Sequence, residues 1–192
     1  SFAKRREMIR SGVEAKAKEM GGRAILSEAL LEEVTALVEW PVPVAGRFEE
    51  RFLELPREVL ISTLQDHQRY FAVEDATGRL LTAFITVSNI ESREPAQVRT
   101  GNERVVRPRL SDAAFFWQQD RREPLAARLA GLDAVTFQAK LGSLGAKVKR
   151  IESISETISA RLNWNVLQAQ RSAALAKCDL LTAMVGEFPE LQ

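Results

Sequence analysis

The residue types that most often carry out catalysis are scarce in this chain. It has one histidine, His67, and one cysteine, Cys178, so zinc sites that need several such ligands are excluded. A Ser-His-Asp triad would have to use His67, and no nucleophile-elbow sequence supports one. Walker A, GxGxxG, HExxH and EF-hand spacings are also missing. The sequence therefore predicts no catalytic centre, no cofactor and no tightly bound transition metal in these residues.

Clusters of basic residues are the remaining candidates for a binding site. One arginine-rich stretch runs from residue 99 to 122 and includes Arg104 and Arg107. The second cluster consists of Lys140, Lys147, Lys149 and Arg150. Such clusters suit contacts to the phosphates of a nucleic acid. On the residue pattern alone, a solvated helix face with ion pairs is the simpler interpretation, and both interpretations stay open.

Arg109 is a separate case within the first cluster. On a helical wheel that starts at Val105, apolar residues as far as Phe116 share one face, and Arg109 projects into this face. An arginine in an apolar stripe must extend to solvent or find an anion. Asp112 lies three residues further on and is within reach. We therefore expect a largely buried structural ion pair between Arg109 and Asp112 rather than a catalytic arginine.

The overall composition is that of an ordinary globular protein. The 192 residues are 45% hydrophobic and 28% charged, which is enough for a core and for one or two domains. The net charge is only +1, so any contact to a nucleic acid must come from local clustering. No apolar run reaches the roughly 18 residues of a membrane helix, and Ser1 to Arg10 contain no secretory signal. We interpret the chain as an internal piece of a longer protein.

Helices and a small sheet are expected in the first two thirds of the chain. The hydrophobic spacing predicts a helix over residues 4–20 and a second helix that Ser27 caps. The apolar stripe of the second helix consists of Leu30, Leu31, Val34, Leu37 and Val38. Residues 41–46 suit an edge strand, and Pro56 begins a short helix. Residues 70–73 and 80–87 read as two strands of a hairpin whose turn ends at Gly78.

The last third is expected to be helical. Residues 96–120 have a helical period, but Gly101 and Pro108 predict a kink or two helices. A short strand over 134–137 and helices over 148–162 and about 166–186 follow. Trp40, Trp117 and Trp164 are expected in the core, as is Cys178. The predicted fold class is α+β: N-terminal helices with a small antiparallel sheet, then an all-helical C-terminal part. We expect one α+β region over 1–137 and a helical domain over 138–192.

Several long segments resemble one known family. They include Leu55-Pro56-Arg57-Glu58-Val59-Leu60, Gln68-Arg69-Tyr70-Phe71, and Phe84-Ile85-Thr86-Val87-Ser88-Asn89-Ile90. Further ones are Gly101-Asn102-Glu103-Arg104-Val105-Val106-Arg107-Pro108-Arg109-Leu110-Ser111-Asp112-Ala113 and Lys177-Cys178-Asp179-Leu180-Leu181-Thr182. In order, and over essentially the whole chain, these segments resemble the β subunit of bacterial tetrameric glycyl-tRNA synthetase.

The resemblance implies an α2β2 ligase that charges glycine tRNA at the expense of ATP in the cytoplasm, without a membrane partner. In that family the α subunit activates glycine, so ATP and Mg would be used there and not by this chain. The β subunit supplies tRNA binding, and residues 138–192 resemble the start of its HD-type helical domain. The expected partners are glycine tRNA, the α subunit and the remainder of the β subunit. We expect Arg104, Arg107, Lys147, Lys149 and Arg150 to contact the tRNA backbone.

Two other classes of function remain as alternatives. One is a metal-dependent phosphohydrolase of the HD type, but no histidine follows His67, and Asp179 alone cannot rebuild such a metal site. The other is a structural scaffold that contacts only the α subunit. Salt-dependent binding of RNA would separate the scaffold from the RNA-binding protein.

Overall fold

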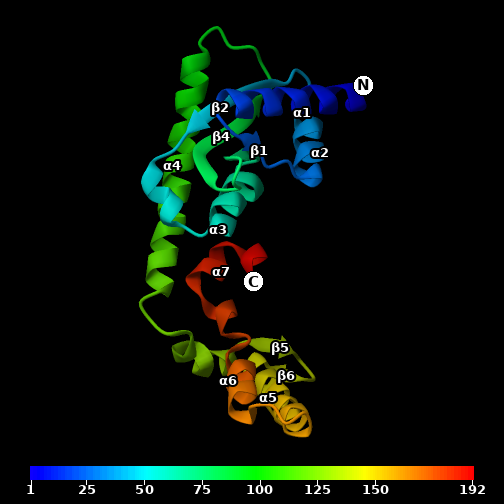
Figure 1. The fold of residues 1–192 in the computed structure, drawn as a ribbon, viewed down its shortest axis with the longest axis vertical. Helices are drawn as coiled ribbons and strands as arrows, with labels where there is room; N and C mark the ends of the chain where they lie inside the picture. The colour runs from blue at the N-terminus through cyan, green and yellow to red at the C-terminus, as the bar shows by residue number, and fades with distance from the viewer. The chain divides into compact units, whose positions relative to one another are not determined.

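The computed structural model describes residues 1–192, which form two compact units (Figure 1). The first unit is Ser1–Phe115 and the second is Phe116–Gln192. The sequence instead predicts a division after residue 137, which falls inside the second unit. Leu132 packs with Leu144, Val148 and Cys178 in one buried cluster, so the segment before residue 137 joins the helices that follow it.

A four-stranded antiparallel sheet forms the centre of the first unit. Its strands, in the order β1-β3-β4-β2, are Arg23–Ala24 (β1), Phe71–Glu74 (β3), Leu80–Ser88 (β4) and Val42–Arg47 (β2). The predicted hairpin of β3 and β4 is confirmed, and Gly78 adopts a φ of +83° in its turn, which glycine reaches without steric cost. The predicted edge strand is also confirmed, since β2 lies at one end of the sheet.

Two helices cover one face of this sheet. They are α1, Phe2–Glu19, and α2, Glu28–Leu37, whose N-terminus Ser27 caps as predicted. Their buried side chains meet the inward residues of β3 and β4 in one core cluster. This cluster contains Ile9, Val13, Ala17, Leu30, Leu31, Val34, Val38, Phe71, Val73, Ala83 and Ile85. The apolar side chains on one face of the strands thus pack against the apolar stripes of α1 and α2.

Two expectations for this core are wrong. Leu37 is 63% exposed and Trp40 is 65% exposed. The buried side of α2 includes Thr35, which the predicted stripe left out, and Leu37, two residues further on, lies on the other side of the helix. Trp40 follows in the connection to β2, where no helix or strand packs its ring into the core.

The opposite face of the sheet carries the short helices and α4. A 3-10 helix spans Glu50–Glu54, α3 spans Arg57–Ser62, and a π-helical turn spans Thr63–His67. The Tyr70 ring stacks on Phe84 with 4.9 Å between ring centroids. At Gly46 a β-carbon would lie 2.4 Å from the Phe84 ring, so this close approach requires glycine.

The long helix α4, Pro95–Asp120, is one continuous element that includes Pro108. Of the two predicted alternatives, two separate helices are therefore wrong, and a kink at Pro108 stays a prediction. Two side-chain contacts hold α4 to the sheet: the Tyr70 hydroxyl donates to Asn102 Oδ1 at 2.6 Å, and the Arg47 N–H donates to Glu103 Oε1 at 2.9 Å. These contacts and the tertiary packing of the helix compensate for the loss of the backbone hydrogen bond that proline cannot donate.

The second unit is mainly helical, as predicted. It contains a 3-10 helix over Leu125–Ala134, a two-stranded sheet of β5, Thr136–Gln138, and β6, Gly142–Ser143, and helix α5, Leu144–Arg161. The single helix expected over 166–186 is wrong. The chain forms α6, Val166–Leu175, a 3-10 turn over Cys178–Leu181, α7, Ala183–Glu187, and a final turn over Pro189–Leu191.

A nearly buried carboxylate determines where α7 begins. Asp120 Oδ1 accepts hydrogen bonds from the Ala183 N–H at 2.9 Å and from Arg128 Nη2 at 2.8 Å, and Oδ2 accepts from the Met184 N–H at 2.7 Å. The Arg128 and Asp120 side chains are only 13% and 10% exposed. The first N–H groups of α7 are thus satisfied by an acid more than sixty residues earlier in the chain, a contact that helical spacing cannot reveal.

We expect Asp120→Ala to destabilise the second unit by about 3–5 kcal/mol, because it leaves the buried Arg128 guanidinium without its partner. The double variant Asp120→Ala/Arg128→Met removes both charges and is expected to cost less than the sum of the single variants. Urea unfolding of the wild type, both single variants and the double variant measures this coupling. Additive effects would contradict a coupled buried pair.

Candidate nucleic-acid interface

The α4 helix turns its predicted arginines outward. Arg104, Arg107 and Arg109 are all exposed, whereas Val106, Leu110 and Ala113 form the buried stripe. The expected burial of Arg109 is therefore wrong. The buried stripe is narrower than predicted, because Val105, which was assigned to it, is 47% exposed, and Arg109 lies on the Val105 side of the helix. A shift of the stripe by one residue rotates the inward face by about 100°.

The ion pairs on α4 also differ from the expected ones. Arg109 and Asp112 are both exposed and form no ion pair with each other. Arg107 Nε instead lies 2.6 Å from Glu49 Oε1, with 62% of the Arg107 side chain exposed. An exposed pair of this kind contributes only about 0–1 kcal/mol, so the arginine can exchange its carboxylate for another anion at little cost. Arg104 is exposed beside it on the same helix.

The second predicted cluster lies at the start of α5. Lys149 and Arg150 are exposed, and Lys147 is half-buried with its Nζ 3.9 Å from the centroid of the Phe137 ring. This cation–π contact ties α5 to strand β5 and restricts the lysine side chain. The Ser143 hydroxyl accepts from the Ala146 N–H at 3.1 Å and caps the helix. The positive end of the helix dipole adds to the charge of these cations.

The two clusters belong to different units. Arg104 and Arg107 are in Ser1–Phe115, and Lys147, Lys149 and Arg150 are in Phe116–Gln192. Within the second unit all three residues lie in the first turns of α5, where Lys147 and Arg150, three residues apart, are neighbours on the helix surface. Lys140 is exposed in the turn between β5 and β6. This α5 cluster, defined as Lys147, Lys149 and Arg150, has the clearest geometry for contacts to phosphate.

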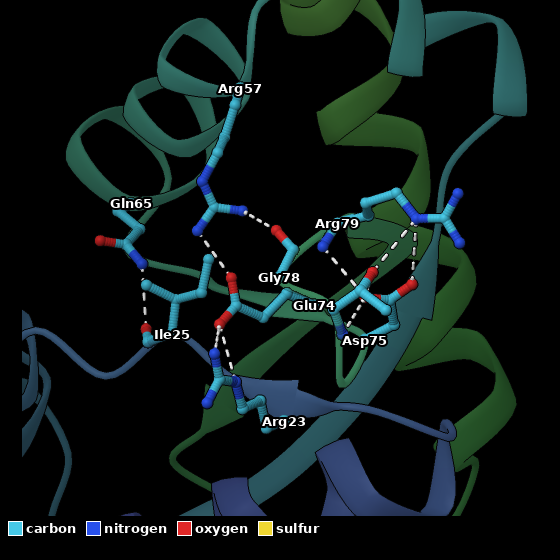
Figure 2. A network of polar contacts seen from close by, with 9 residues as sticks. Arg23, Ile25, Arg57, Gln65, Glu74, Asp75, Gly78 and Arg79 are labelled. Atoms are coloured by element: carbon cyan, nitrogen blue, oxygen red, sulfur yellow. Dashed lines mark hydrogen bonds and ion pairs between the residues drawn. The ribbon is translucent and has the colours of Figure 1, made fainter.

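A polar cluster around Glu74 in the first unit was not predicted from the sequence (Figure 2). The Glu74 side chain is 9% exposed, and its Oε2 lies 2.6 Å from Arg57 Nη2, while its Oε1 lies 2.8 Å from Arg23 Nη2. The hydrogen bond from Arg57, more than the charge of Arg23, holds the pKa of this carboxyl below its usual value. Arg57 also donates to the Gly78 carbonyl at 2.8 Å. Glu74 thus joins β1, β3 and α3, which is a structural role.

The signal for this role in the sequence is weak. Glu74 ends an otherwise apolar strand, Phe71–Glu74, in which every residue is buried. A charge at such a position needs partners, but Arg23 and Arg57 are far away in sequence and only the fold brings them together. The neighbouring Gln65 Nε2 donates to the Ile25 carbonyl at 3.0 Å and links the π-helical turn to the segment that follows β1.

Cys178 has the expected structural role. It is fully buried, and its Sγ lies 3.8 Å from the Ala174 carbonyl oxygen. Burial, followed by the negative charge of Asp179, raises the pKa of its thiol. A raised pKa keeps the sulfur as the unreactive thiol. No group of three or more His, Cys, Asp or Glu side chains is placed to hold a metal ion. None of the helices combines the length and the apolar character needed to cross a membrane.

The fold and these sites define a mixed α+β protein whose exposed cations gather on helices. A family described as the glycyl-tRNA synthetase beta subunit matches residues 1–192. The chain is 54% identical over 192 residues to the glycine–tRNA ligase beta subunit of Marinobacter nauticus, and 52% identical over 191 residues to that of Pseudomonas aeruginosa. It is 54% identical over 191 residues to that of Azotobacter vinelandii. All of this chain is covered, but it spans only 28% of each relative.

The chain belongs to the glycyl-tRNA synthetase β-subunit family. The resemblance noted in the sequence motifs is therefore confirmed over its full length.

The exposed position of Arg109 has a direct consequence for stability. We expect Arg109→Ala to change the free energy of unfolding by less than about 0.5 kcal/mol, as for other surface substitutions. The neighbouring Leu110→Ala removes a fully buried side chain and is expected to cost about 2–5 kcal/mol. Chemical denaturation of both variants measures the difference. A large loss in Arg109→Ala would mean that this arginine is buried after all.

The hairpin turn gives a second prediction, through Asp75. This carboxylate accepts from the Thr77 hydroxyl at 2.6 Å and from the Arg79 N–H at 3.0 Å, and these bonds lower its pKa from 3.8 to about 2. Since the pKa is lower in the folded state, Asp75 stabilises the native state above about pH 4, and this contribution is lost as the pH falls towards 2.

We expect Thr77→Val to raise the pKa of Asp75 towards 3.8, because it removes the hydroxyl donor. An NMR titration of the Asp75 carboxyl carbon measures the shift. The control is Thr157→Val, which removes a threonine hydroxyl from α5 and is expected to leave the pKa of Asp75 unchanged. An unaltered titration in Thr77→Val would contradict the assigned cause.

Proposed function

We propose that this chain is the part of a glycine–tRNA ligase β subunit that contacts the tRNA backbone and supports assembly with the α subunit. In this role it takes part in the ATP-dependent glycylation of tRNA without containing the reaction centre. The family match over residues 1–192 supports the ligase, and the α5 cluster is the observation that supports contact with RNA.

The chemistry of the α5 cluster suits a phosphate backbone. Lys149 and Arg150 are exposed in the second turn of α5, and the Phe137 ring holds Lys147 near Arg150, its neighbour three residues further on. No acidic residue lies between positions 138 and 151. Cations of this kind fix the position of RNA without reading its bases, so the binding is salt-dependent and tolerant of sequence.

Glycine activation belongs to the α subunit in this proposal, with ATP and Mg²⁺ bound there. The arrangement of this chain supports that division. The nucleotide-binding motifs Walker A and GxGxxG are missing from its sequence. Its one cysteine is buried. The side chains of Glu74 and Asp120 are largely buried, and each forms an ion pair with an arginine. The HD-type phosphohydrolase gains no support, because no group of potential ligands is placed to hold a metal.

We expect Lys149→Glu/Arg150→Glu in the assembled ligase to raise the KM for tRNA and leave the KM for glycine unchanged. Each lost phosphate contact is expected to lower the slope of log Kd against log salt by roughly 0.9 on a duplex and 0.7 on a single strand. The measurements are aminoacylation kinetics at several salt concentrations and direct binding of tRNA.

The matched control is Arg161→Glu/Arg171→Glu, which reverses two exposed charges of the same unit, one at the C-terminal end of α5 and one on α6. This control separates a local contact from a general effect of net charge. If the double variant folds and assembles but its KM for tRNA and salt dependence match those of the control, the α5 cluster is a solvated face. The scaffold alternative would then be favoured.

A further inference from the structure

The outer edge of strand β2 has no partner strand, because β2 is the last strand in the order β1-β3-β4-β2. On the inner edge, the Phe48 N–H donates to the Thr82 carbonyl at 3.3 Å. The Arg47 N–H points the other way and donates to Glu103 Oε1 on α4 at 2.9 Å. These directions alternate along an antiparallel strand, so the N–H and C=O of Ala45 also point outward.

A groove of about 570 Å³ runs along this outer edge. Residues Val42–Arg47 form its floor, and α1 and α4, which lie on opposite faces of the sheet, form its walls. Met20 on α1 and Pro95 and Ala96 on α4 give both walls apolar contact area. A strand added to β2 would lie about 4.8 Å away, and its side chains would alternate between the two walls. The groove therefore has the geometry for strand addition.

The charge of the groove indicates what kind of strand it accepts. Both acids in its lining are engaged, since Glu19 Oε2 lies 2.8 Å from Lys16 Nζ and Glu103 accepts from the Arg47 N–H. The guanidinium groups of Arg47 and Arg99 also line the groove, are exposed, and form no ion pair. The uncompensated charge is positive, so the complementary occupant is acidic.

The backbone of this edge favours a peptide over RNA. Ala45 offers one donor and one acceptor, which match the groups of a second extended peptide, whereas phosphates only accept. Pro43 occupies the preceding outward position and has no N–H to donate. Together with Glu103, which already occupies the Arg47 N–H, it limits the free edge to a short stretch around Ala45. Such a stretch suits a short strand and disfavours unselective pairing of edges.

We propose that the outer edge of β2 binds an extended acidic segment of a partner protein as a fifth strand of the sheet, with its carboxylates beside Arg47 and Arg99. This inference goes beyond the proposed contact with RNA. It concerns the edge of the sheet in the first unit, whereas the α5 cluster lies in the second unit.

Selection of peptides tests this proposal. A library of random linear peptides is selected on a full-length β subunit that contains this chain, and the Kd of each selected peptide is measured by fluorescence anisotropy. We expect acidic peptides whose Kd rises about tenfold or more in Ala45→Pro, because the outward N–H is lost. The hydrogen bonds between β2 and β4 do not use this N–H, and urea unfolding checks that the variant keeps its stability.

A second measurement leaves the protein unchanged. Methylation of single backbone nitrogens in a selected peptide is expected to weaken binding at alternate positions only, since alternate N–H groups of a strand face its partner. Weakening at every position or at none would overturn strand addition.

The arginines are tested with Arg47→Ala/Arg99→Ala, which is expected to raise the Kd about tenfold at low salt and by less at high salt. The matched control is Lys18→Ala/Arg109→Ala, which removes exposed cations of α1 and α4 that do not line the groove. Equal Kd values for the two double variants, or selected peptides without acidic residues, would overturn the acidic partner.

Two further outcomes would assign the groove to another occupant and overturn the proposal. If no selected peptide depends on Ala45, the edge is closed or already covered within the subunit. If a single-stranded RNA oligonucleotide displaces the peptide, the groove is an RNA site. None of these measurements uses aminoacylation or the α5 cluster, so a failure here is distinct from an unchanged KM for tRNA in the α5 variants.

Discussion

The second unit depends on the carboxylate of Asp120. Its two oxygens accept the first N–H groups of α7 and the guanidinium of Arg128, so one side chain joins the end of α4, the 3-10 helix and the C-terminal segment. A charge buried this deeply is tolerated only with several strong donors. Because two of the donors are the Ala183 and Met184 N–H groups, the carboxylate also determines where α7 begins.

An analogous constraint acts in the first unit through α4. Hydrogen bonds from Tyr70 to Asn102 and from the Arg47 N–H to Glu103 fix the rotation of this helix on the sheet. With that rotation, Val106, Leu110 and Ala113 face inward, and the arginines at positions 104, 107 and 109 face solvent. The inward polar contacts therefore determine which cations are available to a partner. A helix of mixed apolar and basic residues needs such anchors. Its hydrophobic pattern alone does not determine which side of the helix faces the sheet.

The α5 helix combines two kinds of surface within one element. Its first turns carry exposed cations beside Phe137, and its last turns carry exposed isoleucines that lead to Trp164. Electrostatic contacts act over several ångströms and tolerate water, whereas apolar docking requires close contact and exclusion of water. The two ends of the helix therefore suit different partners.

The sequence by itself determined the elements whose signals are local. The cap at Ser27, the edge strand near Pro43, the hairpin that turns at Gly78 and the absence of a cluster of histidine or cysteine ligands all follow from neighbouring residues or from composition. The long motifs also identified the family, and the exposed positions of Lys149 and Arg150 were predicted correctly.

Only the tertiary structure decided the exposure of Arg109, Trp40 and Trp164, the unit boundary near Phe115 and the break between α6 and α7. The physical reason is the same for each. Helical or strand period indicates which residues share a face, but burial depends on what that face meets. The partners of Glu74 and Asp120 lie far away along the chain, so their contacts leave no local periodicity in the sequence.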